Sequence, residues 1–212
     1  MQNGAARRKS ALKKKLLAAA GTSLAEMLVC TILFSLAFMV AASGLLFAYN
    51  STTAVMKEAD AQTVTDTILN RICGELAGMV KDDPVRTDNT TGNATIVAFT
   101  DSGGIPVYIC QKKVATTKTD DSQLLIHYSE VTGNGMTIPA SDWTFGAEAY
   151  KGYGITELLF TYGSHAGKLT VTVHLTIQSP AGKTFATKRT VWCPNQSKDN
   201  GIMQANVADI TK

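Results

Sequence analysis

The chain contains one long apolar run, from Met27 to Val55, in which no residue is charged. About 20 predominantly apolar residues are enough for a helix to cross the hydrocarbon core of a bilayer. Glu26 directly precedes the run. A carboxylate costs roughly 2.5–3.5 kcal/mol at the bilayer centre, and less near its surface. The sequence therefore predicts a helix that crosses a membrane once and carries an ionisable group at its start.

The residues before this run are basic. No acidic residue occurs in residues 1–21, which contain Arg7, Arg8, Lys9, Lys13, Lys14 and Lys15. Because the whole chain has a net charge of only +3, the part that follows is slightly negative. Positive flanks stay in the cytoplasm, so we expect the C-terminal part to lie outside it. That part has no basic patch of the kind that nucleic-acid binding needs.

The junction between the basic segment and the apolar run reads GTSLAE, starting at Gly21. It resembles the N-terminus of type IV prepilins and pseudopilins, in which a basic leader ends in Gly and a Phe-Thr-Leu-Ile-Glu-like motif opens a hydrophobic helix. Gly21, Leu24 and Glu26 match this motif, whereas Thr22 and Ala25 replace the usual Phe and Ile. The resemblance covers roughly the first 60 residues.

The resemblance implies a processing site and an assembly site. A prepilin peptidase would cut after Gly21, and the family usually methylates the new amine, here that of Thr22. Glu26 would pair with this amine on a neighbouring subunit, and Leu24 would belong to the same assembly motif. The implied partners are other pilin or pseudopilin subunits, membrane lipid and, indirectly, an assembly platform with its ATPase. The protein would be a single-pass membrane protein before assembly and part of a cell-surface or envelope filament afterwards.

The stretch from Thr22 to Lys81 contains no proline and predicts one long helix over residues 22–81. Residues 24–49 would cross the membrane, residues 50–81 would be amphipathic, and Gly44 is a weak point where the helix could break. Apolar residues recur at helical spacing on one side of the second part, at Ile68, Leu69, Ile72, Cys73, Leu76 and Val80. We expect Asp82-Asp83-Pro84 to end the helix.

After the helix the pattern changes to strands. Apolar and β-prone runs separated by Gly, Asp, Ser and Thr occupy residues 94–100, 105–110, 124–128, 155–162, 169–177 and 184–193. We therefore predict an α+β fold, in which the C-terminal half of the long helix packs on an antiparallel sheet formed by residues 82–193. The polar tail, residues 194–212, should be loosely held.

Cys30 lies in the apolar run, which leaves three cysteines for an oxidising exterior. Cys110 and Cys193 each end a strand-like run, so a bridge between them is the favoured pairing. No Cys/His spacing indicates a metal site, and we expect no metal or cofactor. The chain has no G-x-S-x-G motif, and no catalytic residue is proposed.

Two other interpretations remain open. Met27–Val40 could be the apolar part of a secretory signal, with small residues for cleavage at Val40-Ala41-Ala42. The rest would then be a signal-anchored or secreted β-rich binding domain that does not polymerise. An extracellular enzyme is the third class, and it would need convergent polar groups in a concave site. The first residue of the mature chain distinguishes a filament subunit from a secreted domain.

Overall fold

The computed structural model describes residues 23–80, 83–90, 92–113, 122–133, 136–197 and 202–204. Gly21 and Thr22, where processing is predicted, lie outside the described residues, as do residues 1–20. The chain forms two compact units, Met1–Met56 and Lys57–Lys212. The helix named α2 begins in the first unit and ends in the second.

Helix α2 spans Leu24–Ala77, a length of 54 residues, and continues through Gly44 without a break. It ends earlier than the predicted stop at Pro84. Gly78 follows the last helical residue, and the chain then joins the sheet, because the Val80 N–H donates to the Thr100 carbonyl oxygen at 2.9 Å. An early sheet contact, beside a glycine that disfavours helix, therefore ends α2 before the proline does.

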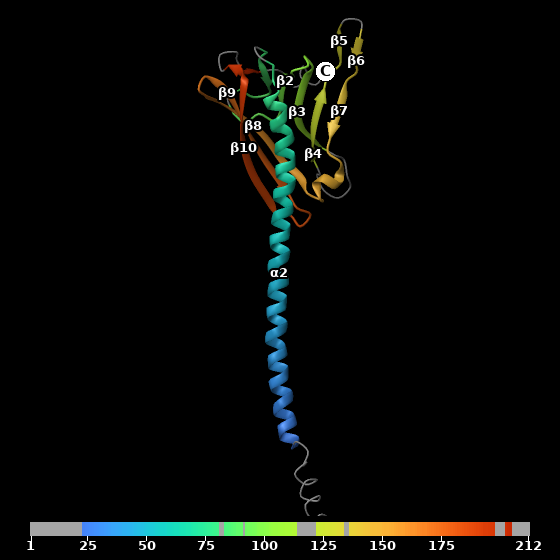
Figure 1. Ribbon diagram of the computed structural model, residues 1–212, viewed down its shortest axis with the longest axis vertical. Helices are drawn as coiled ribbons and strands as arrows, with labels where there is room; N and C mark the ends of the chain where they lie inside the picture. The colour runs from blue at the N-terminus through green and yellow to red at the C-terminus, as the bar shows by residue number, and fades with distance from the viewer. Residues whose placement is uncertain are drawn as a thin grey trace, which may run out of the picture. The chain divides into compact units, whose positions relative to one another are not determined.

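The sheet of the second unit is antiparallel except at one edge (Figure 1). Eight of its nine strands follow the order β10-β9-β8-β4-β3-β2-β1-β11, and the ninth, β7, pairs with β4. The strands are β1 Val85–Thr87, β2 Val97–Thr100, β3 Pro106–Lys113, β4 Ser122–Tyr128, β7 Ser141–Thr144, β8 Gly154–His165, β9 Lys168–Gln178, β10 Thr184–Ser197 and β11 Ile202–Gln204. A separate pair consists of β5 Val131–Gly133 and β6 Met136–Ile138, and a 3-10 helix covers Ala147–Tyr150.

Strands β8, β9 and β10 form a long meander, as the alternating pattern of residues 169–177 predicted. Its junction with β4 is narrow, because β4 and β8 share only the pair Ser122↔Ile155. The Gln111 side-chain amide supports this junction by donating to the Ile155 carbonyl oxygen at 2.9 Å. A further bridge joins β8 to the segment before β2, because Ala94 and Phe160 exchange two backbone hydrogen bonds.

The C-terminal half of α2 lies across one face of this sheet (Figure 1). Its fully buried residues recur at three- and four-residue steps, as an amphipathic helix requires: Ala61, Val64, Ile68, Leu69, Ile72 and Leu76. They share one core cluster with apolar residues from β1 to β4 and from β8 to β10. The predicted α+β fold with one apolar N-terminal helix and an antiparallel sheet is confirmed. Val80, which was predicted to be buried, is only partly so, and Met79 takes its place.

The prediction of a loose tail from residue 194 is wrong for two segments. Strand β10 continues through Pro194 to Ser197, and β11 pairs in parallel with β1. Gln196 is only 2% exposed, and its amide donates to the carbonyl oxygens of Val80 and Asp83. Polar composition was misleading here, because these polar side chains satisfy the backbone at the end of α2.

The predicted Cys110–Cys193 bridge is not formed, and both residues are free cysteines. Strands β4, β8 and β9 lie between β3 and β10, so at a strand spacing of ~4.8 Å the two residues are about 19 Å apart. A disulfide needs Cα atoms within about 7 Å. The residues also belong to different core clusters, so this pairing does not fit the sheet.

Candidate functional site: the two ends of the long helix

Ser23 and Glu26 form a reciprocal capping box at the N-terminus of α2. The Ser23 N–H donates to Glu26 Oε2 at 2.8 Å, and the Glu26 N–H donates to Ser23 Oγ at 3.3 Å. The first helical bond follows, from the Met27 N–H to the Ser23 carbonyl oxygen at 3.1 Å. Ser or Thr three residues before Glu is the usual sequence for this cap. Glu26 therefore has a local structural role as well as the predicted assembly role.

The cap leaves part of the Glu26 carboxylate available. Oε2 accepts the bond from Ser23, and Oε1 has no hydrogen bond to any residue that the structure describes. An ionised carboxylate offers about four lone-pair positions, so it can keep its cap and also accept a cationic donor. Leu24, the other residue of the predicted assembly motif, is 85% exposed. The helix end thus presents an acceptor beside an apolar side chain.

In the first unit, α2 has one side of small residues. At 100° per residue, Glu26 shares this side with Cys30, Leu33, Ala37, Ala41, Gly44 and Ala48, of which all but Leu33 are small. The opposite side carries more large aliphatic side chains, and Leu28, Ile32, Met39 and Leu46 are all exposed there. Small residues let two helices approach closely. The side that carries Glu26 is therefore the one suited to helix–helix contact.

α2 is long and apolar enough to cross a membrane, and no other helix in the described ranges is. No residue in its most apolar segment is buried by another part of the chain. This property fits a membrane anchor or a signal segment equally well.

In the second unit, a polar cluster joins α2 to β4 and β7. Arg71 Nη2 lies 2.6 Å from Glu75 Oε1, and it donates to the Tyr128 hydroxyl at 2.8 Å. That hydroxyl donates in turn to Glu75 Oε1 at 2.9 Å. The Arg71 guanidinium also stacks on Trp143, at 4.5 Å from the ring centroid. Burial, together with the Glu75 carboxylate, raises the pKa of Tyr128. The cluster fixes the rotation of the helix on the sheet.

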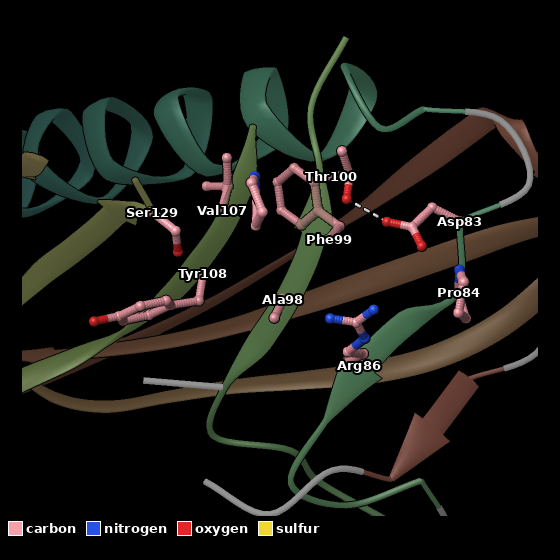
Figure 2. Close-up of a pocket in the computed structure, with 10 residues that line it drawn as sticks. Asp83, Pro84, Arg86, Ala98, Phe99, Thr100, Val107, Tyr108 and Ser129 are labelled. Atoms are coloured by element: carbon pink, nitrogen blue, oxygen red, sulfur yellow. Dashed lines mark hydrogen bonds between the residues drawn. The ribbon is translucent and has the colours of Figure 1, made fainter. Parts of the chain in front are cut away.

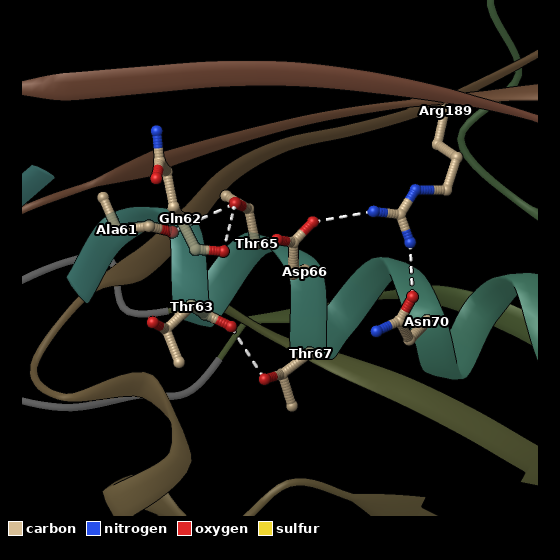
Figure 3. A network of polar contacts seen from close by, with 8 residues as sticks. All are labelled: Ala61, Gln62, Thr63, Thr65, Asp66, Thr67, Asn70 and Arg189. Carbon is tan, nitrogen blue, oxygen red and sulfur yellow. Dashed lines mark hydrogen bonds and ion pairs between the residues drawn. The ribbon is translucent and has the colours of Figure 1, made fainter. Parts of the chain in front are cut away.

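A second polar contact joins α2 to β10. Arg189 donates to Asp66 Oδ1 at 2.7 Å and to Asn70 Oδ1, two residues one helical turn apart (Figure 3). Figure 3 shows the guanidinium reaching across from the strand to both side chains. At the other end of the same contact, Asn195 Nδ2 donates to the Met79 carbonyl oxygen at 3.1 Å. Strand β10 is therefore hydrogen-bonded both to α2 and to the residues that directly follow it.

The hollow between β1, β2 and β3 is too small for a substrate of ordinary size. It measures about 100 Å³ and is lined by Arg86, Tyr108 and Ser129, with Asp83 bonded to Thr100 at its rim (Figure 2). Ligand pockets usually enclose about 300–1,000 Å³. A wider depression on the outer face of β8–β10 is open to solvent and lined by Glu157, His174 and Lys188. Among the described residues, no hydroxyl or thiol that lines either hollow hydrogen-bonds to a histidine.

His127 and Asp142 form an imidazole–carboxylate pair of the kind that occurs in catalytic triads. His127 Nδ1 lies 2.6 Å from Asp142 Oδ1, and the bond holds the pKa of Asp142 below its usual range. The imidazole stacks on Tyr108 at 4.5 Å, and Lys112 lies 3.6 Å from the same carboxylate. No hydroxyl or thiol nucleophile bonds to His127 in the described part of the chain, and the bond to Asp142 joins side chains of β4 and β7. The described residues also include no cluster suited to a metal ion.

No protein-family model matches the chain, and neither a curated protein nor a solved structure is similar to it.

The sequence interpretation missed two features of this site. The Ser23–Glu26 capping box has a clear sequence signal, because Ser lies three residues before Glu. The contacts of Arg189 with Asp66 and Asn70 have none, because they join residues about 120 positions apart.

Proposed function

We propose that this chain is a structural subunit, a pilin or minor pseudopilin, of a type IV pilus-like or type II secretion-like filament. The subunit is processed after Gly21 and is stored in the membrane by the first half of α2. It then assembles through that half-helix, while the sheet domain lies outside the cytoplasm. The main support is the combination of an uncharged, exposed helix and a carboxylate at its first turn, on the side of small residues.

Glu26 is the assembly residue in this proposal. In an isolated subunit its carboxylate caps its own helix and lies near the lipid headgroups. In a filament, neighbouring helices replace water and lipid around it, so the charge needs a cation. The free amine of Thr22 on a neighbouring subunit supplies that cation, while Oε2 keeps its bond to Ser23. Pairing of this kind would also fix the axial register between subunits.

The processing step is tested by the N-terminus of the mature protein. Mass spectrometry of the membrane-extracted chain should find Thr22 first, with or without an N-methyl group. Gly21→Leu should leave the precursor uncut in the membrane. A mature start near Ser43 would instead favour a secreted β-rich binding domain, because it removes the apolar half of α2.

The assembly step is tested by two substitutions that separate charge from capping. Glu26→Gln keeps a side chain that can accept the Ser23 N–H, whereas Glu26→Ala loses both the charge and the cap. Both variants should insert and be cut normally, and both should enter filaments at least tenfold less than wild type. The fraction in sheared filaments, relative to the membrane fraction, measures this. Normal incorporation of Glu26→Gln would reduce Glu26 to a helix cap.

A further inference from the structure

Two cysteines of the second unit, one on α2 and one on β10, belong to the region where the helix packs on the sheet. Cys193 is only 1% exposed and belongs to the main core cluster. Cys73 is partly buried and packs against that same cluster. Both are free thiols in the structure.

The neighbouring contacts locate Cys73 on the helix side that faces β10. Arg189, on β10, bonds to Asp66 and Asn70 of α2. Cys73 lies three residues after Asn70, so Asp66, Asn70 and Cys73 share one side of the helix. The Arg189 guanidinium also lies close enough to the Cys73 thiol to oppose the rise in its pKa.

The same contacts locate Cys193 on the strand side that faces α2. Residues two apart on a strand share a face, so Cys193 lies on the face of Arg189, four residues further on. Asn195, two residues beyond Cys193, bonds to the Met79 carbonyl oxygen. On β10, Cys193 therefore lies between Arg189 and Asn195, which both contact the helical segment. In the sequence, Cys73 lies between their partners Asn70 and Met79.

The environment of the two thiols gives them different reactivity. Burial raises the pKa of Cys193 to about 11, and the nearby Cys73 adds to the increase. Burial also raises the pKa of Cys73, but the Arg189 guanidinium opposes this by favouring the thiolate. Cys73, the more exposed of the two, is therefore the better first nucleophile.

We propose that Cys73 and Cys193 are the two sites of an intrachain disulfide that joins α2 to β10. The Cys73 thiolate attacks the disulfide of an oxidant, such as a thiol–disulfide oxidoreductase or oxidised glutathione, and releases one thiol of that oxidant. Cys193 then displaces the second thiol and forms the S–S bond. The two cysteines lose two electrons and two protons in total, and the oxidant is reduced to two thiols.

The bond would fasten the end of the helix to the last long strand, so that tension along the helix reaches the sheet through a covalent link. Oxidation inside the living cell rests on the proposed function, which places this unit outside the cytoplasm. The pairing itself does not, because it depends only on contacts within the unit. A single experiment can test the disulfide pairing and the location outside the cytoplasm separately.

The test maps thiols in the full chain, extracted in detergent with maleimide present to block exchange. Trypsin should release residues 72–81 linked to residues 190–198, while Cys30 and Cys110 carry maleimide. Incubation with oxidised glutathione before blocking should form the same link in reduced protein. The linked form should melt on the order of 5 °C or more above the reduced form, because the bridge closes a long loop.

Cys110→Ser is the matched control and should keep the link, whereas Cys73→Ser should abolish it. A link that forms only with added glutathione supports the pairing and contradicts the proposed location outside the cytoplasm. Maleimide on both Cys73 and Cys193 after glutathione treatment would overturn the pairing. A link from Cys193 to Cys110 would overturn it as well.

Discussion

The two halves of α2 have the same secondary structure in opposite surroundings. Before Lys57 the apolar side chains are exposed, as Leu36 is at 54%, and no tertiary contact covers them. After Lys57 the apolar side chains face the sheet, and Ile72 is fully buried. In both halves the backbone N–H and C=O groups bond within the helix, so backbone hydrogen bonding is the same in the two halves.

The difference teaches which force acts on each half. The first half has apolar residues around most of its circumference and polar capping groups only at its start, as a helix in lipid requires. The second half has an apolar stripe and polar sides, and it is stabilised by burying that stripe against β-strands. The two halves of the helix therefore differ in what surrounds their apolar side chains, and substitutions can separate them.

The largest expected effect comes from a charge in the buried half. Ile72→Asp should cost about 4–5 kcal/mol or more, because the carboxylate is buried without a partner. Most small domains have only about 5–15 kcal/mol of stability, so the second unit should largely unfold. Denaturation of the full chain in detergent, followed by the fluorescence of Trp143 and Trp192, measures this.

Leu36→Asp is the matched substitution in the exposed half. It should lower membrane insertion, at about 2.5–3.5 kcal/mol for a charge at the bilayer centre. It should leave the unfolding transition of the second unit unchanged. Equal loss of domain stability in both variants would contradict the division of α2 into two environments.

A smaller effect is expected from Tyr128→Phe, which removes a hydroxyl between α2 and β4. The aromatic ring and the Arg71–Glu75 ion pair remain, but Arg71 and Glu75 each lose a hydrogen bond. We expect a loss of about 1–2 kcal/mol, measured as a lower urea midpoint at unchanged slope. Tyr49→Phe, in the exposed half of α2, should have no effect on that midpoint.

The smallest effect is expected at the exposed contact between α2 and β10. Arg189→Gln should cost less than about 1 kcal/mol, because Arg189 and Asp66 are both well exposed to solvent. A double-mutant cycle with Asp66→Asn should give a coupling of about 0.2–1 kcal/mol that falls as salt is added. A larger coupling that resists salt would mean that this contact is shielded from solvent.

The sequence predicted those parts of the fold that depend on local periodicity. The stripe of Ile68, Ile72 and Leu76 and the alternation in β9 each follow from the spacing of apolar residues, and the structure confirms both. The helix was predicted from residue 22, two residues before it begins at Leu24. In each case the signal lies within a few residues of the feature that it predicts.

The features that the sequence did not predict depend on contacts between residues that are distant in sequence. β11 has only three residues, and its pairing with β1 joins positions more than 110 apart, so no local pattern indicates it. The cysteine pairing was mistaken for the same reason, because the order of strands in a sheet cannot be deduced from the strands alone. Only Glu26 as a helix cap could have been predicted from its neighbours.

Gln196 has a consequence for how the chain is made. Its side chain caps the carbonyl groups just after α2, and β11 completes the sheet beside β1, so Gln196 and residues 202–204 stabilise the segment that follows α2. A growing chain that has not yet reached residue 196 lacks both contacts. The unit therefore reaches its full stability only after residue 204 has been synthesised.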